Sequence, residues 1–223
     1  MKNLMRTCFL VLCLFVIPLT VSATPVNFKI NAVNGNSYDL RSGQFNVTID
    51  FDGALPFESD DYDTISFCVD RDNNVSIGDT YLAELNQLPN DNWITAAWLM
   101  DTYAPGFHGG AGLGSVNPNW SANETMAGLQ MAIWFYVGEN VPNPSGSGSP
   151  DVIAIYNYLK TMTLQQPDQF TGSNYRWADL YHISSNERHE HQDQLVRVPV
   201  PEPGTLMLLG LGLFGLGLAR RKK

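Results

Sequence analysis

The first part of the chain alternates apolar and polar residues with the two-residue period of β-strands. Residues 26–30 and 44–51 follow this pattern, and residues 65–69 form a shorter β-prone segment that puts Cys68 in a strand. Strand composition returns at residues 175–183. The pattern predicts one or two antiparallel hairpins near the start of the domain and a further strand at its end.

The middle of the chain changes to the 3.6-residue period of helices. Apolar residues recur at helical spacing in residues 93–103 and 151–164. Residues 124–137 are apolar on nearly every side, which is typical of a buried helix, and Ser121 or Asn123 can cap its start. Because strands come first, then helices, then a strand, we expect an α+β fold: an antiparallel sheet or sandwich with an inserted helical part of about three helices.

Residues 1–23 have the three parts of a secretory signal peptide. Lys2 and Arg6 precede an apolar run at residues 8–16, and small residues lead up to Ala23. We expect cleavage after Ala23. The exported domain then spans residues 24–183, and the polar residues 184–199 are predicted to be a linker.

Residues 200–223 combine three features that are typical of a processing signal. The features are a rigid triplet (Pro201, Glu202, Pro203), an apolar run at 204–219 and a basic end (Arg220, Arg221, Lys222, Lys223). At about 1.5 Å per residue, a transmembrane helix over the run reaches about 24 Å, less than the roughly 30 Å hydrocarbon core of a bilayer. The basic end favours a cytoplasmic terminus. An ordinary C-terminal membrane anchor is the alternative interpretation.

The three features in this order resemble the PEP-CTERM sorting signal of Gram-negative bacteria. The resemblance implies recognition by exosortase, a membrane peptidase that cuts near Pro201, Glu202 and Pro203. It also implies contact with the membrane through the C-terminal helix, at least transiently. The expected route is export, an inner-membrane intermediate, and then the cell surface or extracellular matrix.

Removing the two terminal signals changes the charge and the cysteine content. The chain has 13 Lys and Arg against 22 Asp and Glu, and six of the basic residues lie in the signals. Residues 24–203 therefore carry a formal charge of about −15, which disfavours nucleic acid and anionic lipid as partners and leaves cations, cationic polymers and neutral glycans. Of the three cysteines only Cys68 remains, so the exported protein can form no internal disulfide.

Two short segments suggest a reactive pair. Phe67-Cys68-Val69-Asp70 and the later Leu129-Gln130-Met131-Ala132-Ile133-Trp134 are similar to the motifs of Cys-Gln thioester domains in bacterial surface proteins. The resemblance covers residues 65–138 and implies a bond between Cys68 and Gln130. Leu129 departs from it, because the family has Thr at that position.

The chemistry of such a bond follows from the two side chains. The Cys68 thiolate attacks the Gln130 carboxamide, ammonia leaves, and the acyl thioester can later be opened by an amine or hydroxyl of a target. The reaction needs contact and exclusion of water, and an apolar shell of Phe67, Ile133, Trp134 and Phe135 would suit it. The alternative is a small buried thiol in the core and a Gln130 hydrogen-bonded to backbone.

Other candidate sites are weaker. Asp70, Asp72 and Asn74 alternate like calcium ligands, but an EF-hand needs Gly where Val75 stands and Glu where Tyr81 stands. Histidines with neighbouring glutamates near the end of the domain lack regular ligand spacing (His182, His189, His191, Glu187, Glu190). Both sets are also explained as solvated polar segments.

The sequence contains no catalytic constellation, so we predict neither an enzyme nor a cofactor. Two functions remain. The first is an exported thioester module, similar to an adhesin, that couples covalently through Cys68 and Gln130 to an amine or hydroxyl on a target surface. The second is a non-covalent polysaccharide-binding or structural matrix protein without a thioester.

Overall fold

The computed structural model describes residues 25–34, 43–53, 55–106, 113, 116–144, 149–162 and 168–199. The predicted signal peptide with its cleavage site after Ala23, the triplet from Pro201 to Pro203 and the apolar run with its basic end all lie outside these residues. Within the described part of the chain, no helix is long and apolar enough to cross a membrane.

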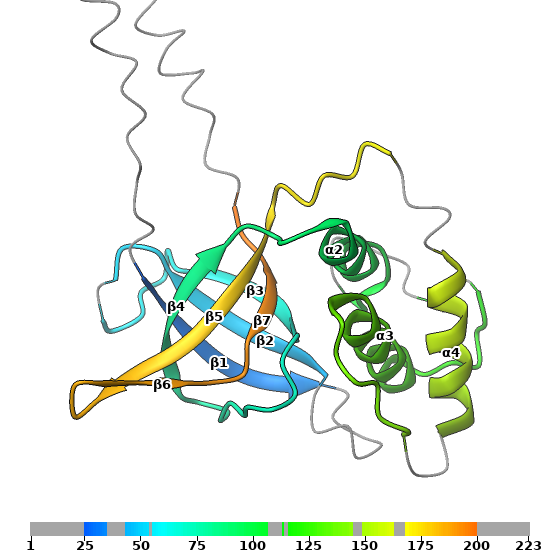
Figure 1. The fold of residues 1–223 in the computed structure, drawn as a ribbon, viewed down its shortest axis with the longest axis horizontal. Coiled ribbons are helices and arrows are strands. Elements are labelled where there is room, and N and C mark those ends of the chain that lie inside the picture. Colours follow the sequence, from blue (N-terminus) through cyan, green and yellow to red (C-terminus); the bar gives the residue numbers. More distant parts are fainter. Residues whose placement is uncertain are drawn as a thin grey trace, which may run out of the picture.

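Seven strands form one antiparallel sheet (Figure 1). They are β1 (Val26–Asn34), β2 (Gln44–Asp50), β3 (Tyr62–Cys68), β4 (Thr80–Asn86), β5 (Tyr175–Ser184), β6 (Glu187–Glu190) and β7 (Gln194–Arg197). Their order is β4-β1-β2-β3-β7-β5-β6, and β4 also pairs with β5. Six strands therefore close into a β-barrel. The seventh strand, β6, pairs with β5 outside the barrel.

Three helices are inserted between β4 and β5 and gather on one side of the closed sheet (Figure 1). They are α2 (Asp91–Tyr103), α3 (Ala122–Val137) and α4 (Ser149–Met162). The predicted α+β fold with about three inserted helices is confirmed. The sheet differs from the expected open sheet or sandwich because β5, which follows the helices, pairs with β4 on one side and with β7 on the other.

The central helix α3 is fixed by its ends and by a close approach. Ser121 accepts a hydrogen bond from the Glu124 amide and Glu124 bonds back, which makes a capping box, and Gly138 ends the helix with φ of 94°. Within the helix, Gly128 packs so closely on α4 that an added Cβ would lie 2.4 Å from Ile155 Cγ2. This contact lets α3 lie close against α4, and residues 125–134 of α3 are all buried.

The prediction that residues 184–199 form a linker is wrong. β6 and β7 lie in this segment. Because β7 pairs with both β3 and β5, the segment completes the barrel. Ser185 and Asn186, with φ of 52° and 65°, make the two-residue turn of the β5–β6 hairpin. The four residues of β6 are all exposed, so this strand has no apolar face that the sequence pattern could show.

Candidate functional site

The end of β3 holds Cys68 inside the protein. Phe67 pairs with Gln44 of β2 and with Leu195 of β7, and Cys68, one residue further along, pairs with Gln194 of β7. Cys68 is fully buried, and its thiol donates a hydrogen bond of 2.7 Å to the backbone carbonyl of Asp70. The sheet therefore presents the sulfur at the edge where the helices pack.

Gln130 of α3 lies directly against Cys68. Its side chain is fully buried, Nε2 donates to the Cys68 carbonyl at 2.7 Å, and Oε1 accepts from the Cys68 amide at 3.2 Å. The carboxamide thus satisfies both backbone groups of the residue whose thiol it would acylate. The structure brings together two residues that are 62 positions apart in the sequence.

Burial raises the pKa of the Cys68 thiol to about 12. A hydrogen bond to the Asp70 backbone and a weak one from the Trp134 side chain act in the opposite direction, and the negative charges of Asp70 and Glu139 add to the increase. At neutral pH the group is therefore a protonated thiol. In its burial and its raised pKa it differs from the exposed, low-pKa cysteines that react with many electrophiles.

A cation covers this part of α3. The Arg71 guanidinium lies 5.1 Å from the centre of the Trp134 ring, and its Nη1 donates to the Asn140 carbonyl at 2.6 Å. Burial, followed by the charges of Asp70 and Asp72, raises the pKa of nearby Glu139. The loop after β3 is thus tied to the C-terminal end of α3 on the same side as Cys68.

The expected apolar shell is only partly correct. Phe67, Ile133 and Trp134 are buried, but Phe135 is 44% exposed, because it lies on the solvent side of α3. Cys68 and Trp134 belong to the core inside the closed sheet, whereas Phe67 and Ile133 belong to the core between sheet and helices. Consecutive residues of a strand face opposite sides, so Phe67 does not share the side of Cys68.

The candidate calcium loop uses its oxygens for its own turn. Asp70 Oδ1 accepts from the Asp72 amide at 2.8 Å, and Oδ2 accepts from the Asn73 side chain at 2.7 Å. The backbone carbonyl of Asn74 faces His191 Nδ1 at 3.2 Å. These contacts agree with a polar turn.

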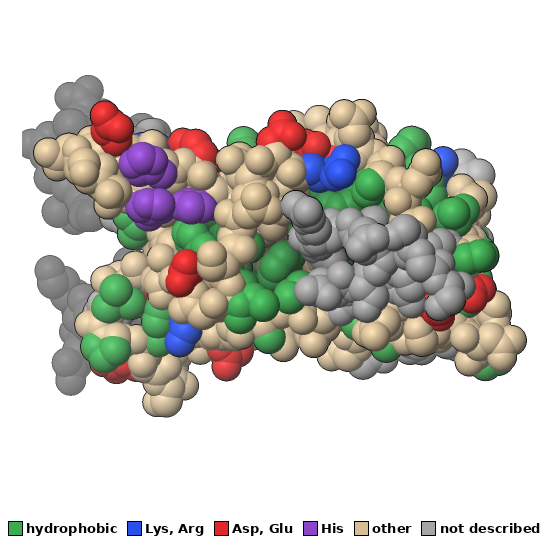
Figure 2. Space-filling view, turned by 90° about the horizontal axis from the view of Figure 1, so that it is seen from below, with side chains coloured by type: hydrophobic (Ala, Val, Ile, Leu, Met, Phe, Trp, Pro, Cys, Tyr) green, Lys and Arg blue, Asp and Glu red, His purple; other side chains and the backbone are tan. Residues whose placement is uncertain are grey.

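The histidines of the β5–β6 ribbon gather on one face of the molecule (Figure 2). The ring of His182 stacks on those of His189 and His191, with centroids 5.1 and 4.7 Å apart. Across the described residues, however, no three His, Cys, Asp or Glu side chains are arranged so that they could hold a metal ion.

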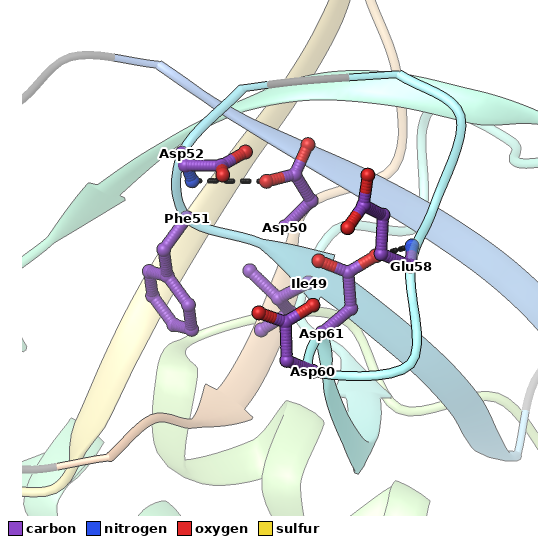
Figure 3. A pocket seen from close by; sticks show the side chains of 7 residues that line it. All are labelled: Ile49, Asp50, Phe51, Asp52, Glu58, Asp60 and Asp61. Carbon is purple, nitrogen blue, oxygen red and sulfur yellow. Dashed lines mark hydrogen bonds between the residues drawn. The ribbon is translucent and has the colours of Figure 1, made fainter.

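An acidic cavity of about 160 Å³ lies at the end of β2 that is remote from the Cys68 pairing (Figure 3). Its acidic lining comes from the end of β2 and the loop after it (Asp50, Asp52, Glu58, Asp60, Asp61). Burial acts to raise the pKa of Asp50, but hydrogen bonds, first from Asn27, outweigh it and hold the pKa below its usual value. Sequence reasoning identified only an acidic loop here.

A second cavity, of about 220 Å³, lies where α2 meets β5 and β7. Its lining is mostly polar and includes Asp101, Asn174 and Arg197, beside the aromatic rings of Phe170 and Tyr175. The Tyr175 hydroxyl donates to Asp101 Oδ1 at 2.7 Å, and burial followed by this carboxylate raises the tyrosine pKa. The pattern of the sequence did not predict this grouping, because its members come from three separate elements.

Comparison with known proteins identifies the C-terminal signal. Residues 199–223 match the PEP-CTERM protein-sorting motif. The motif marks the chain for export, for processing by the membrane peptidase exosortase and for sorting through the membrane to the cell surface.

Among solved structures, the chain is similar to the N-terminal thioester domain of a surface protein from Clostridium perfringens. The TM-score is 0.48 and the identity 11%, over 76% of this chain and 97% of that one. No curated protein sequence matches the chain.

Proposed function

We propose that the exported domain forms an internal thioester between Cys68 and Gln130 and uses it to couple covalently to a target surface. The observation that carries this proposal is the pair of hydrogen bonds, 2.7 and 3.2 Å long, by which the buried Gln130 carboxamide holds the backbone of Cys68. A backbone-bonded glutamine also satisfies a simple structural role, so the chemistry needs its own test.

The reaction needs only the two side chains. The Cys68 sulfur attacks Gln130 Cδ, a C–S bond forms, and the C–N bond breaks. The thiol proton ends on the leaving nitrogen, which departs as ammonia. An amine or hydroxyl of the target then attacks the same carbon, and the thiol is restored. Atoms and charge balance without a cofactor, an oxidant or a reductant.

Burial supports the lifetime of such a bond. Cys68 and Gln130 are both fully buried, and water must be kept out if an acyl thioester is to persist until it meets a target. The exported protein also has no second cysteine to capture Cys68 in a disulfide. A protein sorted to the surface of a Gram-negative cell or its extracellular matrix would meet amines and hydroxyls of polysaccharides and other surfaces there.

The mass of the intact protein tests the proposal. We expect purified residues 24–199 to be lighter than the sequence predicts by one ammonia, about 17 Da. The Cys68→Ala variant should have its full expected mass. A wild-type protein of full mass, with a thiol that can be alkylated after denaturation, would contradict thioester formation.

A second candidate is non-covalent polysaccharide binding without a thioester. The cavity of about 220 Å³ beside Tyr175 favours it, because charged and amide groups beside the partly exposed Phe170 ring are suited to sugar hydroxyls and to one ring face. Full mass in the experiment above would make this the better proposal.

A further inference from the structure

Trp134 carries a buried hydrogen-bond donor that lacks a strong acceptor. Only 1% of the residue is exposed, and within the described part of the chain no hydrogen bond of ordinary geometry satisfies Nε1, which acts as a weak donor to the Cys68 thiol. Buried tryptophans normally find an acceptor for this N–H, since the lost hydrogen bond to water is otherwise not replaced. The orphan donor therefore needs an explanation at this position.

The position of the ring relates this donor to the reactive pair. Trp134 follows Gln130 by four residues on α3, so the two side chains lie on neighbouring turns of the same helix face. Helical side chains lean towards the N-terminus, which brings Trp134 towards Gln130. The indole N–H also donates weakly to the Cys68 thiol, which lowers the pKa of the thiol, and both residues belong to the same core cluster, so the donor faces the reacting sulfur.

The ring is held in place from outside. The Arg71 guanidinium lies over it at 5.1 Å and is itself fixed by a 2.6 Å bond to the Asn140 carbonyl. A preorganised donor stabilises developing charge without having to reorient during the reaction.

We infer that the Trp134 Nε1–H is one of two donors of an oxyanion hole for the carbonyl oxygen of Gln130; this assignment rests on the proposed thioester. The other donor is the Cys68 amide, which already binds Oε1 at 3.2 Å. When sulfur attacks Cδ, the π electrons of the C=O bond move to Oε1 and the oxygen becomes negative. Both donors bind it, and the C=O bond re-forms as ammonia leaves.

The same oxyanion forms when a target amine opens the thioester, because the amine attacks the same carbon. Trp134 is therefore expected to accelerate both formation and opening of the bond. A purely structural tryptophan would affect the stability of the fold and leave these two rates unchanged. This difference separates the two roles.

The test measures both rates by intact mass. Formation is followed as loss of ammonia after refolding of the reduced protein, and opening as the gain of methylamine by the folded protein. We expect Trp134→Phe to slow both reactions by about 100-fold, as loss of one oxyanion donor does in other acyl-transfer sites. Trp98→Phe, which alters a buried tryptophan of α2, is the matched control and should react at the wild-type rate.

A second variant isolates the N–H from the shape of the ring. Replacing Trp134 by its benzothiophene analogue keeps the size of the side chain and removes only the donor. Both reactions should be as slow in this analogue as in Trp134→Phe. If the phenylalanine variant does not fold, the analogue alone tests whether the N–H accelerates the reactions. Wild-type rates in the analogue, in a protein that forms the thioester, would overturn the role of Trp134 alone. A wild-type protein of full mass would overturn the thioester and the oxyanion hole with it.

Discussion

Two regions of this protein gather polar side chains from distant parts of the chain, and they do so in opposite surroundings. Where α3 meets the end of β3, Cys68 and Gln130 are fully buried. On the ribbon of β5 and β6, three histidines and Arg188 lie at the surface. The difference teaches that a polar group needs a hydrogen-bond partner within the protein in the first region but not in the second, because water can replace a lost partner only at the surface.

Judged by the number and charge of its contacts alone, the surface region would be expected to contribute more to stability than the buried one. Arg188 makes three ion pairs of 2.9, 2.7 and 2.6 Å, to Glu84, Asp179 and Glu190, and its hydrogen bond with Glu190 is the main cause that raises its pKa. Gln130 makes two neutral hydrogen bonds. Burial nevertheless makes the two neutral bonds the more important set, since their loss leaves backbone groups without any partner.

The largest effect is expected at Gln130. In a Cys68→Ala background, which cannot form a thioester but keeps the backbone of residue 68, Gln130→Leu should lower the free energy of unfolding by about 2–4 kcal/mol. The cause is that the amide and the carbonyl of residue 68 both lose their hydrogen-bond partner, the Gln130 carboxamide. Urea denaturation measures the change.

The matched control for this variant is Asn157→Leu, the same kind of change on the exposed face of α4. It should stay within about 0.5 kcal/mol of its parent. Equal costs for the two leucine variants would show that burial does not distinguish the regions as argued.

An intermediate effect is expected at Asp193, which lies between the two regions. Its side chain accepts from Trp177 Nε1 at 2.8 Å and its carbonyl accepts from the Val69 amide at 2.9 Å. Burial raises the pKa of Asp193 to about 6 from 3.8. The folded state thus binds this proton more tightly, so the stability it contributes is complete below pH 3.8 and is lost as the pH rises through 6.

Comparison with Asp193→Asn isolates this contribution. A pKa raised from 3.8 to about 6 corresponds to about 2 kcal/mol between pH about 7 and about 4, and contact of the carboxyl with water reduces this. The stability difference between wild type and variant should therefore shift in favour of wild type by about 1 kcal/mol over this range. Thermal melts over this pH range measure it, with Asp60→Asn at the exposed loop as the control for removal of one charge. A difference that is independent of pH would argue against a raised pKa.

The smallest effect is expected at Arg188. Arg188→Gln should cost less than about 1 kcal/mol despite the loss of three ion pairs, because these partners remain in contact with water. The cost should shrink further in about 1 M salt, which screens surface charges. Denaturation at low and high salt measures both, and Arg188→Lys tests whether charge alone suffices. A cost as large as that of Gln130→Leu would remove the distinction between the regions.

Much of the fold could be predicted from periodicity, and its failures have physical causes. The three helices and the strands β1 to β3 each have an apolar face, so their patterns are visible. The strand β4 has only two buried residues, Tyr81 and Ala83, and the pattern does not predict it. β6 is wholly exposed and β7 has only four residues, so neither shows a repeat, and the pattern predicts a linker there. Closure of the sheet could not be predicted, because it depends on β5 meeting β4 and β7 at once.

The candidate site could be predicted from short motifs and not from periodicity. Cys68 and Gln130 were named because short motifs around them resemble a family, since periodicity alone gives a buried cysteine and a glutamine in an apolar helix. The motif already contained Trp134, but only as part of an apolar shell. Its N–H became a candidate donor only when the structure showed it to be buried without a strong acceptor.

The sequence by itself determined where this protein is sent. The sorting motif at residues 199–223 is a linear pattern of rigid, apolar and basic residues that can be recognised without a fold. Only the tertiary structure decided what lies next to Cys68, because residue 130 reaches it through the packing of α3 on the end of β3. A contact between residues 62 positions apart depends on the packing of every element between them, and the periodicity of the chain does not predict it.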